Sequence, residues 1–284
     1  MKSVFCFLAL FFASLSFSQN PGNCDLKFIN HLMDAGDYNE ALYLMDSTDC
    51  SLSHSNDSLN YLRGWSLYSL KRLSASSEYL MKVSQKSELY LKSHFFAAYN
   101  YTYLGDTKNA LEVLSTTAYK TEKQNSLRNY ETAGVYLLLG DTMRYKESFA
   151  RTNRNFYEIS ESADNLQNIS TDLKKHKTKS PVIAGILSGI IPGSGKFYAG
   201  KRGEAISAFI ATTGLGLVTW ENYRKNGLAD FRTIAFGTAF AFSYTANIYG
   251  AVMTVNIIET EYGENVKNSI LFNLHIPLRN IFDK

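Results

Sequence analysis

The sequence predicts an all-α fold in two parts, a helical-repeat solenoid and a hydrophobic, membrane-embedded helical hairpin, followed by a short C-terminal β-strand. Three observations predict it. A turn signal returns about every 35 residues in the first half, charge-free apolar segments occupy 205–220 and 233–258, and apolar residues alternate over 269–278. Each pattern has the period or the length that its kind of element requires.

The N-terminus has the pattern of a secretory signal. One lysine precedes the apolar run Val4–Leu15, and small residues lie before Gln19. We expect cleavage after Ser18, so that residues 1–18 are removed and the protein is exported to the cell envelope. An uncleaved anchor helix is the alternative, although the run is short for a membrane span.

Two cysteines remain after this cleavage, Cys24 and Cys50, and they flank a predicted helical hairpin. An exported protein meets an oxidising compartment, and an antiparallel hairpin brings its two ends together. We therefore expect a Cys24–Cys50 disulfide, with two unpaired buried thiols as the alternative. The residues before Cys24 do not form a lipobox, so lipidation is not expected.

The first half contains an internal repeat. Its turn positions, 35, 34 and 35 residues apart, are Gly36, Lys71, Gly105 and Gly140. Small residues flank the turns where two helices would pack closely, as Ala98 and Ala110 do in the third unit. Lys71 in place of glycine, and Tyr145 in place of a small residue, are departures from this pattern.

This pattern resembles the tetratricopeptide repeat family over roughly residues 25–151, in about four units. The resemblance implies pairs of antiparallel helices and a concave groove that binds a protein segment. A generic helical bundle is the alternative. Residues 152–179 then supply a capping helix with one apolar stripe and a basic linker.

Aromatic side chains are concentrated on the first helix of each predicted pair, at Tyr61, Trp65, Tyr68, Phe95, Tyr99, Tyr103 and Tyr130. Aromatic anchors are enriched in protein-binding sites. We take Trp65, Tyr68, Tyr99 and Tyr103 as the candidates for contact with a protein partner. The other interpretation is that most of these rings belong to the core between repeats.

The segment 180–258 is apolar and is broken once, at Pro192-Gly193, where a helix should stop. Gly185 and Gly189 share one face of the helix before this break, which lets a second helix approach. The letters PGSGK are not a phosphate-binding loop, because Lys196 is followed by phenylalanine and the first glycine is missing.

Two uncharged runs follow, Ala205–Trp220 and Thr233–Ile258, and the second is long enough to cross a bilayer. The sequence thus predicts lipid contact through residues 180–258. A helical domain with buried hairpins and no membrane contact is the alternative.

The same segment carries the pattern SPxxAGxLSxxxPGxGQxYxG and then NIYGA, with Lys196 in place of glutamine. It resembles an uncharacterised hydrophobic domain of bacterial envelope proteins, loosely similar to TM2-type hairpins. We expect one structural cluster of Pro192, Gly193, Gly195, Tyr198, Gly200, Asn247, Tyr249 and Gly250. Asn247 lies in an apolar helix, where its amide needs a partner, and the backbone freed by Pro192 is a candidate.

In the tail, 259–284, the alternation over Ser269–Leu278 predicts an edge strand, with Asn273 and His275 turned away from its apolar side.

Several activities lack the residues that they require. The formal charge of +3 and the absence of a basic face argue against nucleic acid. The five histidines are scattered, and no catalytic or dinucleotide motif occurs, so we expect no metal, no cofactor and no enzyme activity.

We expect a non-enzymatic envelope protein whose periplasmic repeats bind a protein partner and whose hairpin anchors it to a membrane. The alternatives are an accessory subunit of an envelope transport or secretion system, a soluble periplasmic repeat protein, and an enzyme with its site in the glycine-rich segment.

Overall fold

The computed structural model describes residues 26–47 and 56–282, and the elements within these ranges are all α-helices. The all-α class is therefore confirmed. Residue contacts divide the chain into two units, which are described separately: unit 1 is Met1–Asn165 with Leu271–Lys284, and unit 2 is Leu166–Ile270. The predicted signal segment and the predicted Cys24–Cys50 disulfide lie outside the described residues.

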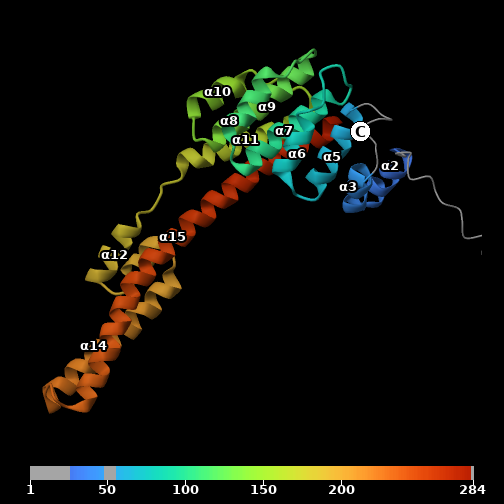
Figure 1. Ribbon diagram of the computed structural model, residues 1–284. Helices are drawn as coiled ribbons and strands as arrows, with labels where there is room; N and C mark the ends of the chain where they lie inside the picture. The colour runs from blue at the N-terminus through green and yellow to red at the C-terminus, as the bar shows by residue number, and fades with distance from the viewer. Residues whose placement is uncertain (1–25, 48–55, 283–284) are drawn as a thin grey trace, which may run out of the picture. The chain divides into compact units, whose positions relative to one another are not determined.

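Unit 1 consists mainly of consecutive helix pairs (Figure 1). Its helices are α2 (Leu26–Ala35), α3 (Tyr38–Ser47), α5 (Asn56–Ser69), α6 (Leu73–Leu80), α7 (Tyr90–Leu104), α8 (Thr107–Thr116), α9 (Glu122–Leu138) and α10 (Thr142–Ala150). Helix α11 (Tyr157–Lys175) begins in unit 1, and the last residues of α15 (Phe231–Phe282) also belong to it.

The four predicted turn positions share one backbone geometry. All are left-handed, with φ of 87° at Gly36, 62° at Lys71, 82° at Gly105 and 72° at Gly140. In each case the next residue donates its N–H to the carbonyl five residues earlier, as Asp106 does to Tyr101. This is the Schellman ending of a helix, and its recurrence reverses the chain at regular intervals.

The residue after the turn starts the second helix. Asp106 and Asp141 cap α8 and α10, because their side chains accept hydrogen bonds from the N–H groups of Asn109 and Arg144. Arg72 holds the same place in the second pair and makes no such bond. The second pair therefore lacks both the glycine and the cap that the third and fourth pairs have.

Small residues allow close packing within and between pairs. A Cβ atom on Gly64 of α5 would lie 2.7 Å from the Leu80 side chain of α6. Ser76 of α6 donates its hydroxyl to the Gly64 carbonyl at 2.7 Å and accepts from the Asn100 amide of α7 at 3.0 Å. Tyr145, a departure from the small-residue pattern, is buried and stacks on Phe149.

The predicted C-terminal strand is wrong, because Ser269–Leu278 is helical and lies within α15, and the described residues contain no strand. The buried apolar residues follow a helical stripe, Ile270, Leu271, Leu274 and Leu278, which shares three positions with the alternating pattern. The alternation omitted Leu271 and included Phe272, whose side chain is 64% exposed.

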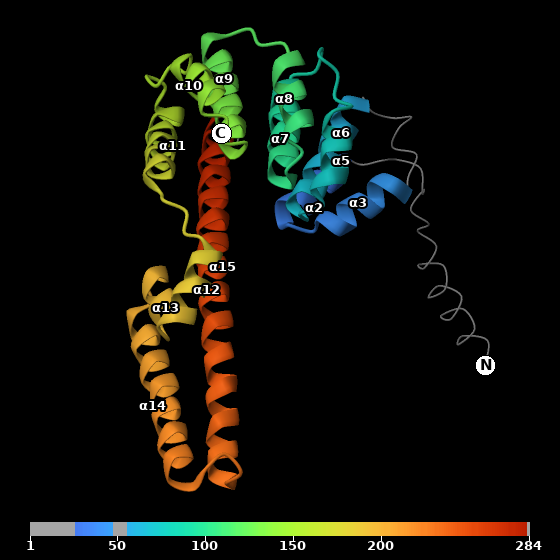
Figure 2. The same cartoon turned by 90° about the vertical axis from the view of Figure 1, so that its left-hand side faces the viewer.

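Unit 2 contains α12 (Pro181–Ile190), α13 (Ser194–Ala199), α14 (Arg202–Asn226) and α15 up to Ile270. Helices α14 and α15 lie side by side (Figure 2), joined by a hydrogen bond between the Thr212 and Ser243 hydroxyls at 3.1 Å. A Cβ atom on Gly216 would lie 3.0 Å from the Phe240 ring, so this glycine permits the close approach.

None of the helices in the described ranges has the length and apolar character needed to cross a membrane. The prediction of a membrane-spanning segment at 233–258 is therefore wrong. Threonine, serine, tyrosine and Asn247 interrupt the apolar run of α15, and charges at Glu204 and Glu221 bound that of α14.

We predict that Lys71→Gly stabilises unit 1 by about 0.5–1 kcal/mol. A residue with a side chain loses about 1–2 kcal/mol in the left-handed conformation, and glycine avoids this cost. Part of the gain is lost because glycine gives the unfolded chain more conformational freedom. Lys71→Ala is the matched control, since it also removes the contact of the ammonium with the Tyr68 ring but keeps the strain. Urea unfolding measures both. A glycine variant no more stable than the alanine variant would contradict the prediction.

Candidate functional site

In unit 1, side chains from the first helix of three successive pairs form one surface, which we call the first-helix face. It is made of residues from α5, α7 and α9, namely Tyr68, Phe95, Phe96, Tyr99, Tyr130 and Gly134. Phe95, Phe96 and Tyr130 are fully buried. The face thus takes aromatic side chains from three successive helix pairs.

Residues 271–282 at the end of α15, here called the docked segment, cover this face (Figure 2). The Tyr68 hydroxyl and the Nε2 atom of His275 form a hydrogen bond. The His275 ring stacks on Tyr99, with ring centroids 5.0 Å apart. His275 was expected to face away from the packed side, but it is held between two of the predicted partner-binding tyrosines.

The four candidate partner-binding side chains differ in accessibility. Tyr68 and Tyr99 are only 9% and 8% exposed, so the chain itself covers them. Trp65 stacks on Tyr68 at 5.2 Å, and the Lys92 ammonium lies 4.3 Å from its ring centroid. Tyr103, 49% exposed and next to Tyr99, is the most accessible of the four.

A buried carboxyl group, that of Glu131 on α9, follows Tyr130 in the sequence. Burial raises its pKa well above the ordinary value, so the folded chain favours the protonated form. Unit 1 therefore loses stability as the pH rises above the ordinary carboxyl pKa, because folding then requires the Glu131 carboxylate to take up a proton. The sequence analysis overlooked Glu131, although a lone acid between Tyr130 and Ala133 was a visible signal.

In unit 2, the Asn247 side chain holds the turn that follows α12. Its Oδ1 atom accepts the Gly193 N–H at 2.9 Å, and its Nδ2 atom donates to the Ser188 carbonyl at 3.2 Å. The Ser188 hydroxyl in turn accepts the Gly195 N–H at 3.0 Å. The amide thus replaces helical hydrogen bonds that end where Pro192 interrupts the chain.

The glycines of this turn bring three helices together. A Cβ atom on Gly193 would lie 2.2 Å from the Ala205 carbonyl oxygen of α14, and one on Gly195 would lie 2.0 Å from the Ala184 carbonyl oxygen of α12. The Gly185 face of α12 packs against α15, where Val252 would be 2.9 Å from an added Cβ. Each position leaves no room for a side chain.

The structure does not bring the whole expected cluster together. Tyr249 lies two residues beyond Asn247 on the same helix, a rotation of about 200°, and is 65% exposed. Gly250 faces the side chain of Lys196, and Gly200 ends α13 in a left-handed conformation. Tyr198 contacts the start of α12 and not the turn, because its hydroxyl accepts the N–H of Ser180, the N-cap residue, at 3.0 Å.

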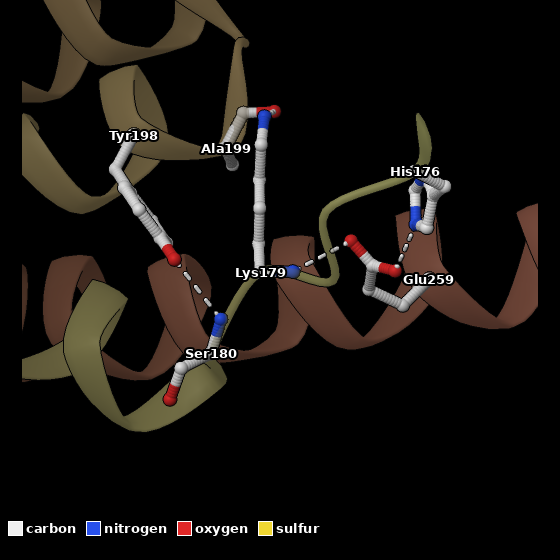
Figure 3. A network of polar contacts seen from close by, with 6 residues as sticks. All are labelled: His176, Lys179, Ser180, Tyr198, Ala199 and Glu259. Carbon is white, nitrogen blue, oxygen red and sulfur yellow. Dashed lines mark hydrogen bonds and ion pairs between the residues drawn. The ribbon is translucent and has the colours of Figure 1, made fainter. Parts of the chain in front are cut away.

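A polar network holds the linker before α12 (Figure 3). The Glu259 carboxylate lies 2.8 Å from Nε2 of His176 and accepts the Lys179 N–H at 3.0 Å. The hydrogen bond with His176 lowers the pKa of the Glu259 carboxyl, and the Lys179 N–H adds to this effect. The His176 ring also stacks on Tyr262, with ring centroids 3.7 Å apart. Helix α15 therefore holds the linker at His176 and at Lys179.

The polar side chains of these two regions make contacts within the chain. The Ser188 hydroxyl and the Asn247 amide are occupied by backbone groups of the turn. Within the described ranges, no three histidine, cysteine, aspartate or glutamate side chains gather as metal ligands do. The first-helix face, in contrast, holds a helix through shape, ring stacking and two tyrosine hydroxyls.

We predict that Asn247→Ala loosens the turn, because the buried Gly193 N–H then has no acceptor, at a cost of about 1–3 kcal/mol. Hydrogen exchange read by mass spectrometry should show faster exchange in α12 and α13. Tyr249→Ala, on the exposed side of the same helix, is the control and should leave exchange unchanged. Equal exchange in wild type and Asn247→Ala would refute the role assigned to the amide.

Comparison with known proteins adds no assignment. No family model, no curated protein and no solved structure matches this chain. What the chain does must therefore be inferred from the contacts within its two units.

Proposed function

We propose that the chain is a non-enzymatic, exported envelope protein whose repeat unit binds a helical segment of a protein partner in the periplasm, and whose hydrophobic unit holds it at a membrane. The observation that carries the proposal is the docked segment, a helix of this chain that packs on the first-helix face through two tyrosine hydroxyls. The four left-handed turns at constant spacing support a repeat array of the tetratricopeptide type.

The apolar surface of unit 2 supports the membrane part of the proposal. Large side chains that are at least half exposed occur on all of its long helices: Val182, Ile186 and Ile190 on α12, Ile206, Ile210, Leu217 and Trp220 on α14, and Phe231, Ile234, Phe242, Tyr249 and Ile257 on α15. Extended apolar surfaces of this kind mark contacts with proteins or membranes. Helices can attach to a bilayer without crossing it, by burying apolar side chains at the boundary between the lipid headgroups and the acyl chains.

Site-specific photo-crosslinking tests the partner. A benzoylphenylalanine residue in place of Tyr103, at the accessible edge of the first-helix face, should capture one discrete protein in intact cells. The same residue at Met143, which is 82% exposed on the second helix of its pair, is the control. Identical products at both positions, or none at Tyr103, would argue against binding at this face.

Vesicle flotation tests the membrane. The full chain should float with phosphatidylethanolamine–phosphatidylglycerol vesicles, and Phe231→Ser with Phe242→Ser should reduce the floating fraction at least tenfold. Each phenylalanine contributes about 1.5–3 kcal/mol when it leaves water. The control is Met143→Ser, an equally exposed apolar residue in unit 1. If the wild-type protein does not float with the vesicles, the proposed attachment to a membrane is contradicted.

A further inference from the structure

The docked segment offers the first-helix face a feature that an ordinary helix lacks. Pro277 lies inside α15 and has no N–H, so it cannot bond to the carbonyl of Asn273, four residues earlier. The Tyr130 hydroxyl donates to this same carbonyl at 3.0 Å. Tyr130 is fully buried, so its hydrogen bond to the Asn273 carbonyl lies away from water.

Two further contacts set the register of the helix on the face. A Cβ atom on Gly134 would lie 2.3 Å from the Leu274 side chain, so this glycine forms the socket for a fully buried leucine. One residue later, His275 bonds to Tyr68 and stacks on Tyr99. The face therefore contacts backbone, leucine and imidazole at three consecutive residues.

We infer that the first-helix face is a binding site for an amphipathic helix of the pattern Asn-Leu-His-x-Pro-Leu, and that residues 271–282 occupy it as an intramolecular ligand. The partner's helix carries the same elements and takes the face when the docked segment leaves. Tyr130 is the residue that distinguishes a helix with this proline from one without it. This inference rests on the proposed function and names the class of partner segment.

Tethering explains why the docked segment holds the face when no partner is present. A segment joined to its site by a short flexible linker acts at an effective concentration of about 1 mM, and we take this value for the docked segment. For a helix of micromolar affinity, this corresponds to about a thousandfold excess of the occupied state. A free peptide of the same sequence should consequently bind the intact chain about a thousandfold more weakly than a chain whose face is empty.

The first experiment empties the face. Leu274→Asp in the full chain places a carboxylate against Gly134 and should release the docked segment. A fluorescent peptide of residues 268–282 should then bind this variant at least 100-fold more tightly than it binds wild type. A variant that is folded by circular dichroism yet does not bind the peptide, or one that unfolds, would overturn the inference and make the segment part of the core.

A double-mutant cycle tests the role of Tyr130. Tyr130→Phe in the emptied chain should weaken binding of the wild-type peptide about tenfold, which is about 1.4 kcal/mol. The same change should weaken binding of a Pro277→Ala peptide less than threefold, because alanine restores the N–H that satisfies the Asn273 carbonyl. Equal losses for both peptides would refute the selection of proline by Tyr130.

Hydrogen exchange of the wild-type chain provides a test without substitutions. Amides of 271–282 should exchange by local opening, at a lower free energy than those of α7 and α9. If the amides of residues 271–282, α7 and α9 all exchange only on global unfolding, the inference is overturned. Crosslinks at Tyr103 without release of the docked segment would support the proposed function and contradict this inference. Peptide binding to the emptied face without any crosslink at Tyr103 would support the helix-binding site and contradict the proposed function.

Discussion

The left-handed turn at the end of each first helix is the constraint on which the helix pairs of unit 1 depend. Four residues with φ between 62° and 87° send the chain back at nearly equal intervals, so that each second helix returns beside its first. The first helices of successive pairs then share one surface. The aromatic first-helix face draws on three of these four reversals, including the one where Lys71 adopts the left-handed conformation without glycine.

In unit 2, the corresponding constraint is close approach of backbones. Gly193 and Gly195 lie where any side chain would collide with a carbonyl oxygen of α14 or α12. Such proximity leaves little space for water, so the polar groups of the turn need partners within the protein. Asn247 of α15 supplies both a donor and an acceptor to the turn, which explains why its amide is buried.

Local patterns predicted much of this structure, and the errors concern long-range contacts. The turn period and the break at Pro192 follow from backbone preferences, which short stretches of sequence encode. The backbone at Pro192 is the expected partner of the Asn247 amide, because a buried amide needs a hydrogen-bond partner, and the structure shows these hydrogen bonds. Nothing local indicated that Tyr68 would meet His275, 207 residues away, and an apolar stripe with members at 270, 274 and 278 fits a strand and a helix equally well.

The place of the docked segment in the chain has a consequence for biosynthesis. The first-helix face is complete once α9 has been made, but its covering residues follow only after all of unit 2. Between these two moments the nascent chain presents Tyr68, Tyr99 and Tyr130 uncovered. The waiting time is set by the synthesis of the roughly 130 residues between Leu138 and Leu271, during which a chaperone can reach the face before the protein's own helix arrives.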